Sequence, residues 1–499
     1  MTVHRFAICT LMAVAGLGCG DTSVTNGPGG APRFEFVSGQ PAADTIQARP
    51  LTTVTVALRD GDGAAIPNEE VRFETTGDAL AGIPFLYLES LDGQRHGAVT
   101  ETTDADGRAA IVALRGEAAG RAWLRVRAPA LAVADSLPFD ILPGNPFEIR
   151  LSPADTGLHV GATYTLHGLV VDAFDNVRPE AVTFTAESTF ASGTGIATVV
   201  VTGEGHGRAS FAATGGGLSA QAWVSVVPTG TLAFFVRAFT TGDSIGIATA
   251  STDGSGYAAL FASEFDFASD RPLDWAPDGQ RLVFHLGTNI QTFRLYHITL
   301  GGVIQPVITQ DIGGYPEMFP RYGPDGWIYF TAVVDPSNGT DELWRVHADG
   351  TSAERIGPPA APFESDTYPA PAPDGEHVWF STDRPSPGPN PVTLAILDVS
   401  AGTVDYLDVY GVGAVWSPVG DRVAFIDQVG AIIVAAPDGS GQRVVSGGNA
   451  VYEPYLDWSS DGQWIVASGA AGVVLIEPDL GVTLPLAFSE RWRHPAWRP

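Results

Sequence analysis

The chain contains no lysine, so each of its 27 basic residues is an arginine. Against them stand 56 Asp and Glu residues, which give a net charge of −29. A nucleic-acid-binding protein needs a basic surface to neutralise phosphates, so this composition excludes that class. Charged residues make up only 17% of the chain and hydrophobic residues 44%, which excludes wholesale disorder.

Cysteines and long apolar runs are also scarce. The two cysteines are Cys9 and Cys19, and Cys9 lies in the apolar run 6–17, so we expect no internal disulfide in the mature chain. That run is shorter than the roughly 20 residues that a membrane-spanning helix needs, and no other run approaches that length. The run follows Arg5 and precedes small residues, which predicts a secretory signal peptide over residues 1–18.

The residues Gly16-Leu17-Gly18-Cys19 resemble a bacterial lipobox, although Gly16 stands where Leu is usual. The resemblance implies that Cys19 is lipidated and anchors an exported protein to a membrane, in the periplasm or at the cell surface. The alternative is cleavage near Gly18 or beyond without a lipid. Residues 19–33 are rich in Gly, Ser, Thr, Asn and Pro, which predicts a flexible tether.

Turn-forming residues are abundant, with 59 Gly and 37 Pro spread along 499 residues. This pattern favours many short strands, and the length predicts about two to four domains. From residue 34, short alternating strands such as 53–58 are separated by turns such as 60–63. The order of strands and turns over 34–143 resembles the bacterial Ig-like domains of invasin and intimin type, and a shorter copy follows over 144–228.

Aspartate pairs recur at the turns of both copies and allow two interpretations. They are Asp60 and Asp62, Asp104 and Asp106, and Asp172 and Asp175. The first interpretation is that they bind Ca²⁺, but the ligand spacing of an EF-hand loop is absent. Because Asp-Gly is a common hairpin turn, we favour turn chemistry.

The rest of the chain repeats the pattern W-x-P-D-G-x-x-[LIV]-x-F at intervals of 39–49 residues. The repeat position is occupied by Trp275, Tyr322, Pro371, Trp416, Trp458 and Trp497. The sixth copy stops at Pro499, while the strand 231–234 near the start lacks its W-x-P partner. We therefore expect the two ends to complete one blade and close a ring of six. The repeat resembles that of TolB-type β-propellers over the whole of 229–499.

These observations predict an all-β protein, with two Ig-like β-sandwiches followed by a six-bladed β-propeller. The predicted domains are a signal peptide (1–18), a tether (19–33), Ig-like domains (34–143 and 144–228) and a TolB-like propeller (229–499). We expect Trp275, Trp416 and Trp458 to pack between blades, because they recur at one repeat position.

The candidate site comes from the repeat register, five residues before the repeat position. Asp270, Glu317, Asp366, Gly411, Glu453 and Trp492 stand there. If these strands line the channel, four carboxylates gather near one mouth, where they could hold Ca²⁺ or a cationic peptide. Candidate partner-binding residues nearby are Arg271, Tyr315, Tyr368, Tyr410, Tyr452, Arg491, Arg493 and His494. The alternative is that these positions are ordinary solvated loops, because the propeller has 32 acidic residues against 13 Arg.

Other catalytic patterns are weak. Residues 242–246 fit G-x-S-x-G by chance, because no strand–elbow–helix context surrounds Ser244. The ten histidines show no zinc-ligand spacing, and no Gly-rich loop precedes a helix. We therefore expect neither a catalytic residue nor a cofactor, with Ca²⁺ as the one open option.

The TolB resemblance implies protein–protein interaction in the cell envelope through the propeller's channel face, with the Ig-like domains as a spacer. We expect a protein partner, a membrane contact through Cys19, and no catalysis. Three alternatives stay open: an adhesin that acts through the Ig-like domains, a glycan-binding protein that uses rim aromatics, and a propeller enzyme that cleaves glycans or peptides with paired carboxylates.

Overall fold

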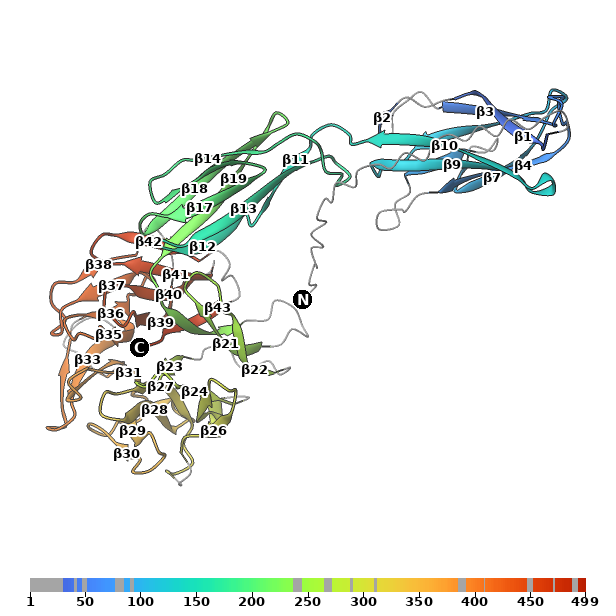
Figure 1. The fold of residues 1–499 in the computed structure, drawn as a ribbon. Coiled ribbons are helices and arrows are strands. Elements are labelled where there is room, and N and C mark those ends of the chain that lie inside the picture. The colour runs from blue at the N-terminus through green and yellow to red at the C-terminus, as the bar shows by residue number, and fades with distance from the viewer. Residues whose placement is uncertain are drawn as a thin grey trace. The chain divides into compact units, whose positions relative to one another are not determined.

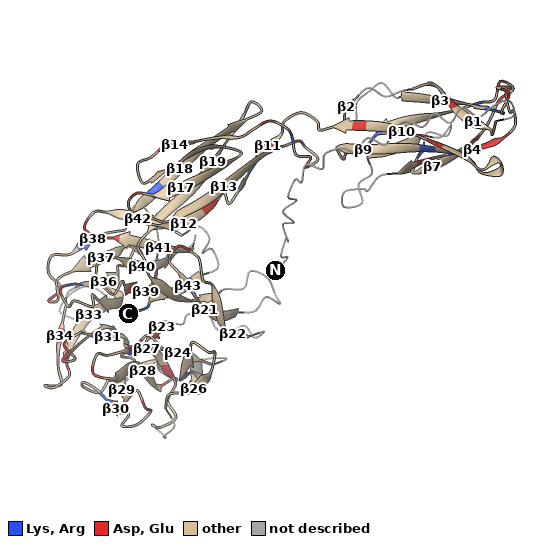
Figure 2. Ribbon diagram, viewed as in Figure 1, with Lys and Arg blue, Asp and Glu red and all other residues tan. Residues whose placement is uncertain are grey.

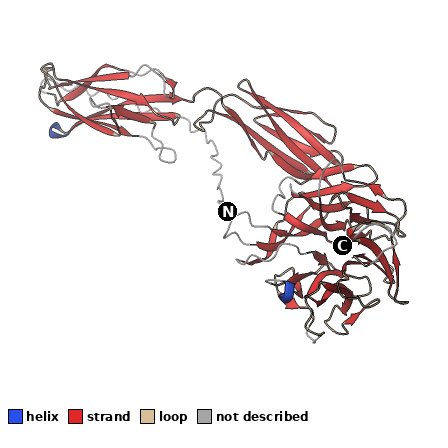
Figure 3. Ribbon diagram, turned by 180° about the vertical axis from the view of Figure 1, so that it is seen from behind, coloured by secondary structure: helices blue, strands red, loops and turns tan. Residues whose placement is uncertain are grey.

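The structure is a computed structural model, and it describes residues 30–39, 43–46, 52–76, 85–89, 94–236, 245–263, 272–287, 290–308, 312–384, 392–407, 409–446, 452–469, 472–486 and 492–499. Cys19, Ser244, Asp270, Arg271 and Arg491 lie outside these residues. Strands dominate the described chain, with two short 3₁₀ helices, η1 (Pro129–Leu131) and η2 (Ile290–Thr292) (Figure 3). Over these ranges, no helix has the length and apolarity needed to cross a membrane. The all-β prediction is confirmed.

The first folded part is a sandwich of two five-stranded sheets around one core. One sheet has the order β1 (Arg33–Ser38), β3 (Thr52–Arg59), β8 (Arg108–Arg115), β5 (Leu86–Glu89), β6 (Arg95–His96). The other has the order β2 (Asp44–Thr45), β10 (Val133–Leu142), β9 (Gly120–Ala128), β4 (Glu70–Thr76), β7 (Ala98–Thr102). In β9, Ala122, Leu124 and Val126 are buried while alternate residues face outward, which is the period of a half-buried strand.

The second sandwich is built in the same way. Its sheets have the orders β11 (Glu148–Ser152), β13 (Thr163–Val171), β17 (Thr198–Gly203), β15 (Ala191–Ser192), and β12 (Asp155–His159), β19 (Leu218–Val227), β18 (Gly207–Gly215), β14 (Thr183–Ala186), β16 (Thr194–Ile196). Both sheets contribute to one core that includes Phe184 and Phe211. Residues 171–178 pack with the first sandwich instead of the second. There the Asn176 side-chain oxygen accepts a hydrogen bond from Ala119 N.

The aspartates at the turns cap their own backbone. Asp60 Oδ1 accepts hydrogen bonds from the N–H groups two and four residues later, at 2.9 and 2.8 Å. Asp104 Oδ1 does the same at 2.8 and 2.9 Å, and Asp172 Oδ1 at 2.8 and 3.0 Å. The same turn thus recurs in both sandwiches, which confirms turn chemistry for these three residues.

The remaining strands form six four-stranded antiparallel blades (Figure 1). Blade I is β23 (Leu273–Trp275), β24 (Arg281–Leu286), β25 (Arg294–Thr299), β26 (Ile304–Pro306); blade II is β27 (Glu317–Tyr322), β28 (Trp327–Asp335), β29 (Thr340–His347), β30 (Glu354–Arg355); blade III is β31 (Asp366–Pro371), β32 (His377–Thr382), β33 (Thr393–Asp398), β34 (Thr403–Tyr406). Blade IV is β35 (Val412–Trp416), β36 (Val423–Ile426), β37 (Ile432–Ala435), β38 (Arg443–Val444); blade V is β39 (Tyr452–Trp458), β40 (Ile465–Gly469), β41 (Gly472–Glu477), β42 (Val482–Pro485). Blade VI joins the two ends of the domain, in the order β43 (Trp492–Trp497), β20 (Thr231–Val236), β21 (Ile245–Ser251), β22 (Ala258–Ser263).

The ring closes as the repeat predicts. Leu232 in β20 pairs with Trp497 in β43, so the chain's last strand is the innermost strand of the blade that β20 begins. The second strand of each blade is covered on both faces by neighbouring blades, and in β32 five consecutive residues are buried. The six-bladed prediction is therefore confirmed.

The W-x-P-D-G residues form the turn from the first to the second strand. In blade I, Asp278 Oδ1 accepts a hydrogen bond from Gln280 N at 2.9 Å, and Gly279 adopts a left-handed φ of 63°. Blade IV has Val419 in place of the aspartate but keeps a left-handed Gly420. The glycine meets the steric demand of the turn and the aspartate only adds a hydrogen bond, so this departure is tolerated.

The second sandwich packs on blades V and VI. His159 Nε2 lies 3.2 Å from Thr252 Oγ1, and His159 Nδ1 lies 3.6 Å from Asp253 Oδ2. The ring of His206 meets that of Trp464 edge-on at 5.3 Å. Asp253 lies in the turn between the third and fourth strands of its blade, and Trp464 in the turn between the first and second strands of blade V. In an up-and-down meander these two turns lie at the same end, so the sandwich sits on the face that carries the W-x-P turns.

Candidate functional site

A cavity of about 350 Å³ opens at the channel mouth on the W-x-P face. Three rings of residues, each contributed by successive blades, line it. The outer rim is formed by the position two residues after the repeat position, occupied by Pro277, Pro324, Pro373, Pro418, Ser460 and Pro499. All six are exposed, so the cavity is open to solvent.

The wall is formed by the repeat position itself. Its members are Trp275, Tyr322, Pro371, Trp416, Trp458 and Trp497. Trp275 Nε1 donates to the carbonyl of Ala496, and Trp458 Nε1 to that of Val415, both at 3.2 Å. These tryptophans therefore pack between blades, as predicted, and also line the cavity, which the sequence analysis did not foresee.

Tyr322 is fixed in the wall by a histidine behind it. Burial and the charge of Arg281 lower the pKa of His297 to about 4, so the ring is neutral at neutral pH. His297 Nε2 lies 3.3 Å from the Ala348 carbonyl and Nδ1 lies 2.9 Å from Tyr322 Oη. A carbonyl only accepts, so the ring proton is on Nε2 and the tyrosine hydroxyl donates to Nδ1.

The floor is formed by the residue before the repeat position, and it is charged. Arg321 in blade II donates from Nη1 to Asp274 Oδ1 in blade I at 3.3 Å, and from Nη2 to the Leu456 carbonyl in blade V at 2.9 Å. Arg321 therefore spans the channel. The second carboxylate of the floor belongs to Asp457, whose oxygens accept hydrogen bonds from the N–H groups of Trp458 and Trp497 at 2.8 and 2.7 Å.

Burial raises the pKa of both floor carboxyls. For Asp274 the guanidinium of Arg321 and the N–H of Tyr322 oppose this effect. For Asp457 the charge of Arg321 opposes it, while the negative charge of Asp274 adds to it. The two carboxylates thus share one guanidinium in a site with restricted water, and each raises the cost of ionising the other.

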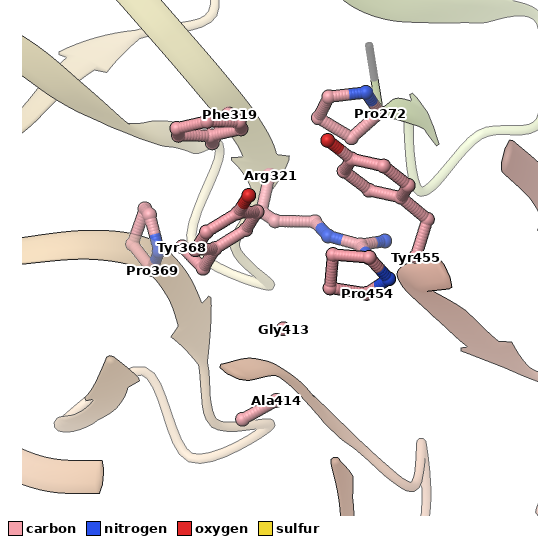
Figure 4. A pocket seen from close by; sticks show the side chains of 9 residues that line it. All are labelled: Pro272, Phe319, Arg321, Tyr368, Pro369, Gly413, Ala414, Pro454 and Tyr455. Atoms are coloured by element: carbon pink, nitrogen blue, oxygen red, sulfur yellow. The ribbon is translucent and has the colours of Figure 1, made fainter. Parts of the chain in front are cut away.

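Beyond the floor, on the side away from the W-x-P mouth, aromatic side chains three residues before the repeat position close the channel (Figure 4). Phe319 and Tyr368 stack with ring centroids 4.1 Å apart, and Tyr455 lies 4.0 Å from the ring of His494. The space left among them is about 10 Å³, about the volume that one water needs. The cavity at the W-x-P mouth is therefore blind.

The predicted carboxylates lie five residues before the repeat position, and each is held by separate partners. Glu317 Oε2 accepts from Leu295 N at 2.8 Å, and burial raises its pKa to about 7. Asp366 forms a buried bidentate pair with Arg384 at 2.6 and 3.0 Å. Glu453 Oε2 accepts from the hydroxyl of Ser468 at 2.8 Å and lies 3.3 Å from His494 Nε2.

These side chains do not form the expected ring. Within the described ranges, no group of three or more His, Cys, Asp and Glu is placed to hold a metal ion. Asp270 and Arg271 lie outside the described residues, and the three carboxylates that are described are separately engaged. The described residues thus give the Ca²⁺ option no support.

A bulge in the innermost strands explains why the predicted carboxylates do not line the channel. Phe319, Tyr368 and His494, three residues before the repeat position, adopt left-handed φ values of 53°, 54° and 49°. The pairing register shifts at the same place in blades II, III, IV and V. Alternation of side chains therefore breaks between the positions three and five residues before the repeat, and the channel-facing prediction fails beyond the bulge.

The aromatics predicted at a rim are mostly internal. Trp492 is 6% exposed and stacks on Phe234 with centroids 3.7 Å apart, and Tyr452 is 8% exposed in the core between blades IV and V. Arg493 is buried and donates to the Trp492 carbonyl, while Tyr315 and Tyr410 are half-buried. Burial of Tyr452 and Trp492 corrects the expectation of a binding rim; Tyr368 does reach the channel, where it helps to close it.

The charged floor of Asp274, Arg321 and Asp457 was not among the predicted site residues. A signal for it was present, because Leu273-Asp274-Trp275 and Leu456-Asp457-Trp458 place an aspartate inside an otherwise apolar strand. The repeat register also gave a signal for the arginine, because Arg321 stands directly before Tyr322, at the same repeat position as the two aspartates.

No family model matches the chain. The uncharacterized protein Atu1656 of Agrobacterium fabrum (strain C58) is 31% identical over 163 residues, 30% of this chain and 53% of that protein. The chain therefore spans about half the length of the curated relative it matches.

Several solved structures are similar at low identity. A nidogen/laminin complex gives a TM-score of 0.39 at 13% identity, covering 54% of this chain and 99% of that one. An oligogalacturonate lyase in complex with manganese gives 0.35 at 12%, covering 69% and 98%. The β-propeller domain of Myceliophteria thermophila Cps50 (Swd1) gives 0.35 at 13%, covering 52% and 86%. These scores add nothing to the strand pairing, which itself establishes an all-β protein with a six-bladed propeller.

Proposed function

We propose that the chain is an exported binding protein of the cell envelope whose propeller receives a segment of a partner protein in the W-x-P cavity. The observation that carries this proposal is the blind cavity of about 350 Å³ with an apolar wall and a polar floor. Ligand sites are typically concave, mostly apolar and fitted with a few placed polar groups, at about 300–1,000 Å³. The cavity is at the small end of that range, which suits one side chain and the backbone beside it.

The second sandwich extends the proposed binding face. It contacts the turns at Thr252 and Trp464, which belong to the same face as the cavity mouth. Gly157 approaches Asp253 so closely that a Cβ there would lie 2.6 Å from the Asp253 backbone. This close docking lets a partner in the cavity also touch the sandwich.

The two sandwiches are, in this proposal, Ig-like modules, and the propeller is of TolB type. The N-terminal segment would export the chain and anchor it through a lipid on Cys19.

Binding fits the floor better than catalysis does. Both Asp457 oxygens accept backbone N–H groups, and the Asp274 oxygens accept from Arg321 and Tyr322 N. A general acid or base must reach a substrate atom and exchange a proton with it. Carboxyl groups whose oxygens are committed to the joints between blades are poorly placed to exchange a proton with a substrate.

The test is affinity capture from the native host's envelope extract with the full mature chain as bait. Ser460→Arg places a long side chain over the cavity at an exposed rim position, so folding should be unaffected. Thr403→Arg, on the exposed outer strand β34, is the matched control. We expect a partner that the wild type and Thr403→Arg capture and Ser460→Arg does not. Equal capture by all three proteins would overturn the proposal and favour the sandwiches as the binding part.

A further inference from the structure

The cavity floor has two carboxyl groups and one guanidinium. Arg321 forms its ion pair with Asp274, and Asp457 is held by backbone N–H groups. Two carboxylates therefore face the cavity with one guanidinium between them. Burial raises the pKa of both carboxyls, so ionising the second one is costly, and a cation that enters the cavity would lower that cost.

The wall is suited to a cation on an apolar stem. Indole and phenol faces attract ammonium and guanidinium groups, and proline rings pack well against methylene groups. Two wall tryptophans already show this chemistry within the chain. The guanidinium carbon of Arg498 lies 5.4 Å from the ring centroid of Trp275, and that of Arg422 lies 5.0 Å from that of Trp458.

Two of the wall tryptophans are held by hydrogen bonds between blades. Trp275 and Trp458 donate to the carbonyl of the residue before the repeat position in the preceding blade. Trp416 Nε1 is buried and has no hydrogen-bond partner among the described residues.

We propose that the cavity binds an arginine or lysine side chain of a partner protein, with the cationic head near Asp274 and Asp457 and the stem along the aromatic wall. This inference rests on the proposed function and specifies its ligand. The propeller's 32 acidic residues against 13 Arg attract such a partner at long range, which speeds encounter at low salt (Figure 2).

The experiment uses the full mature chain and two short capped peptides, acetyl-Gly-Arg-Gly-amide and the same peptide with citrulline. Citrulline keeps the shape of arginine and removes its charge. Calorimetric titration extends to about 10 mM peptide, because one anchored side chain binds in the millimolar range at about −4 kcal/mol. A lysine peptide compares the two cationic heads.

We expect saturable binding of the arginine peptide and at least about tenfold weaker binding of the citrulline peptide. Ser460→Arg should abolish binding by placing a competing cation at the rim. Ser460→Glu, of comparable reach and opposite charge, should keep or strengthen it, and Thr403→Arg should leave it unchanged. Opposite effects at one exposed position cannot come from misfolding.

Other outcomes separate this inference from the proposed function. Equal binding of arginine and citrulline peptides would overturn the cationic ligand and leave a binding cavity. If neither peptide binds but Ser460→Arg still abolishes capture of the envelope partner, the cationic ligand is likewise overturned and the binding cavity is kept. No peptide binding, together with capture indifferent to Ser460→Arg, would overturn both proposals.

Discussion

Glu317 makes the stability of the propeller depend on pH. Its side chain is 3% exposed between blades I and II, and burial raises its pKa from 4.5 to about 7 despite a hydrogen bond from Leu295 N and the charge of Arg294. That displacement corresponds to about 3 kcal/mol. Because the folded pKa lies above the unfolded one, this contribution is fully present below pH 4.5 and is lost as the pH rises through about 7. Glu317→Gln keeps an acceptor for Leu295 N and removes the titration.

The free energy of unfolding should therefore fall between pH 5 and pH 8 by up to about 3 kcal/mol more in the wild type than in Glu317→Gln. Urea unfolding followed by tryptophan fluorescence measures this difference, because nine of the 11 tryptophans lie in residues 229–499. Comparing two proteins at each pH cancels titrating groups that they share. The same substitution at the exposed Glu376 is the matched control. A wild-type minus variant difference that does not change with pH would refute the reasoning.

Three further predictions concern the elements that hold the fold together. Asp366→Ala leaves Arg384 buried without its bidentate partner, with only the Glu364 carboxylate nearby at 3.8 Å, and should cost about 3–5 kcal/mol, measured by the same unfolding assay. Deleting residues 492–499 removes β43 and exposes the edge of β20, so the protein should aggregate or elute as oligomers in size-exclusion chromatography. Asp60→Ala removes the turn hydrogen bonds of the first sandwich and should lower its stability by about 1 kcal/mol, while added Ca²⁺ should shift the melting temperature of neither protein.

The repeat predicted the architecture well because packing imposes it on every blade. A residue such as Trp458 must fill the same space between blades each time, so its spacing counts the blades. Pairing of Leu232 with Trp497 likewise follows from a repeat that is split between the two ends of the domain. Turn aspartates such as Asp60 were interpretable because their hydrogen bonds are local.

The site was harder to predict because it depends on local strain and on contacts between distant segments. Tyr368 adopts a left-handed φ and breaks the alternation of side chains that predicted Asp366 in the channel. A tyrosine rarely adopts a positive φ, so the sequence gives no sign of this bulge. Arg384, which pairs with Asp366, does not belong to any copy of the W-x-P-D-G pattern, so the repeat gives no sign of this ion pair. The floor joins Asp274 to Arg321 across two blades, so only the assembled ring shows that their charges meet.

The central claim is that a partner segment enters the W-x-P cavity, and site-specific photocrosslinking in the native host tests it most directly. A benzoylphenylalanine replaces Ser460 at the rim in one full-length protein and Thr403 on the outer strand β34 in another. The account predicts an ultraviolet-dependent adduct with a protein partner from position 460 and none from position 403. An adduct from position 403 and none from position 460 would contradict it.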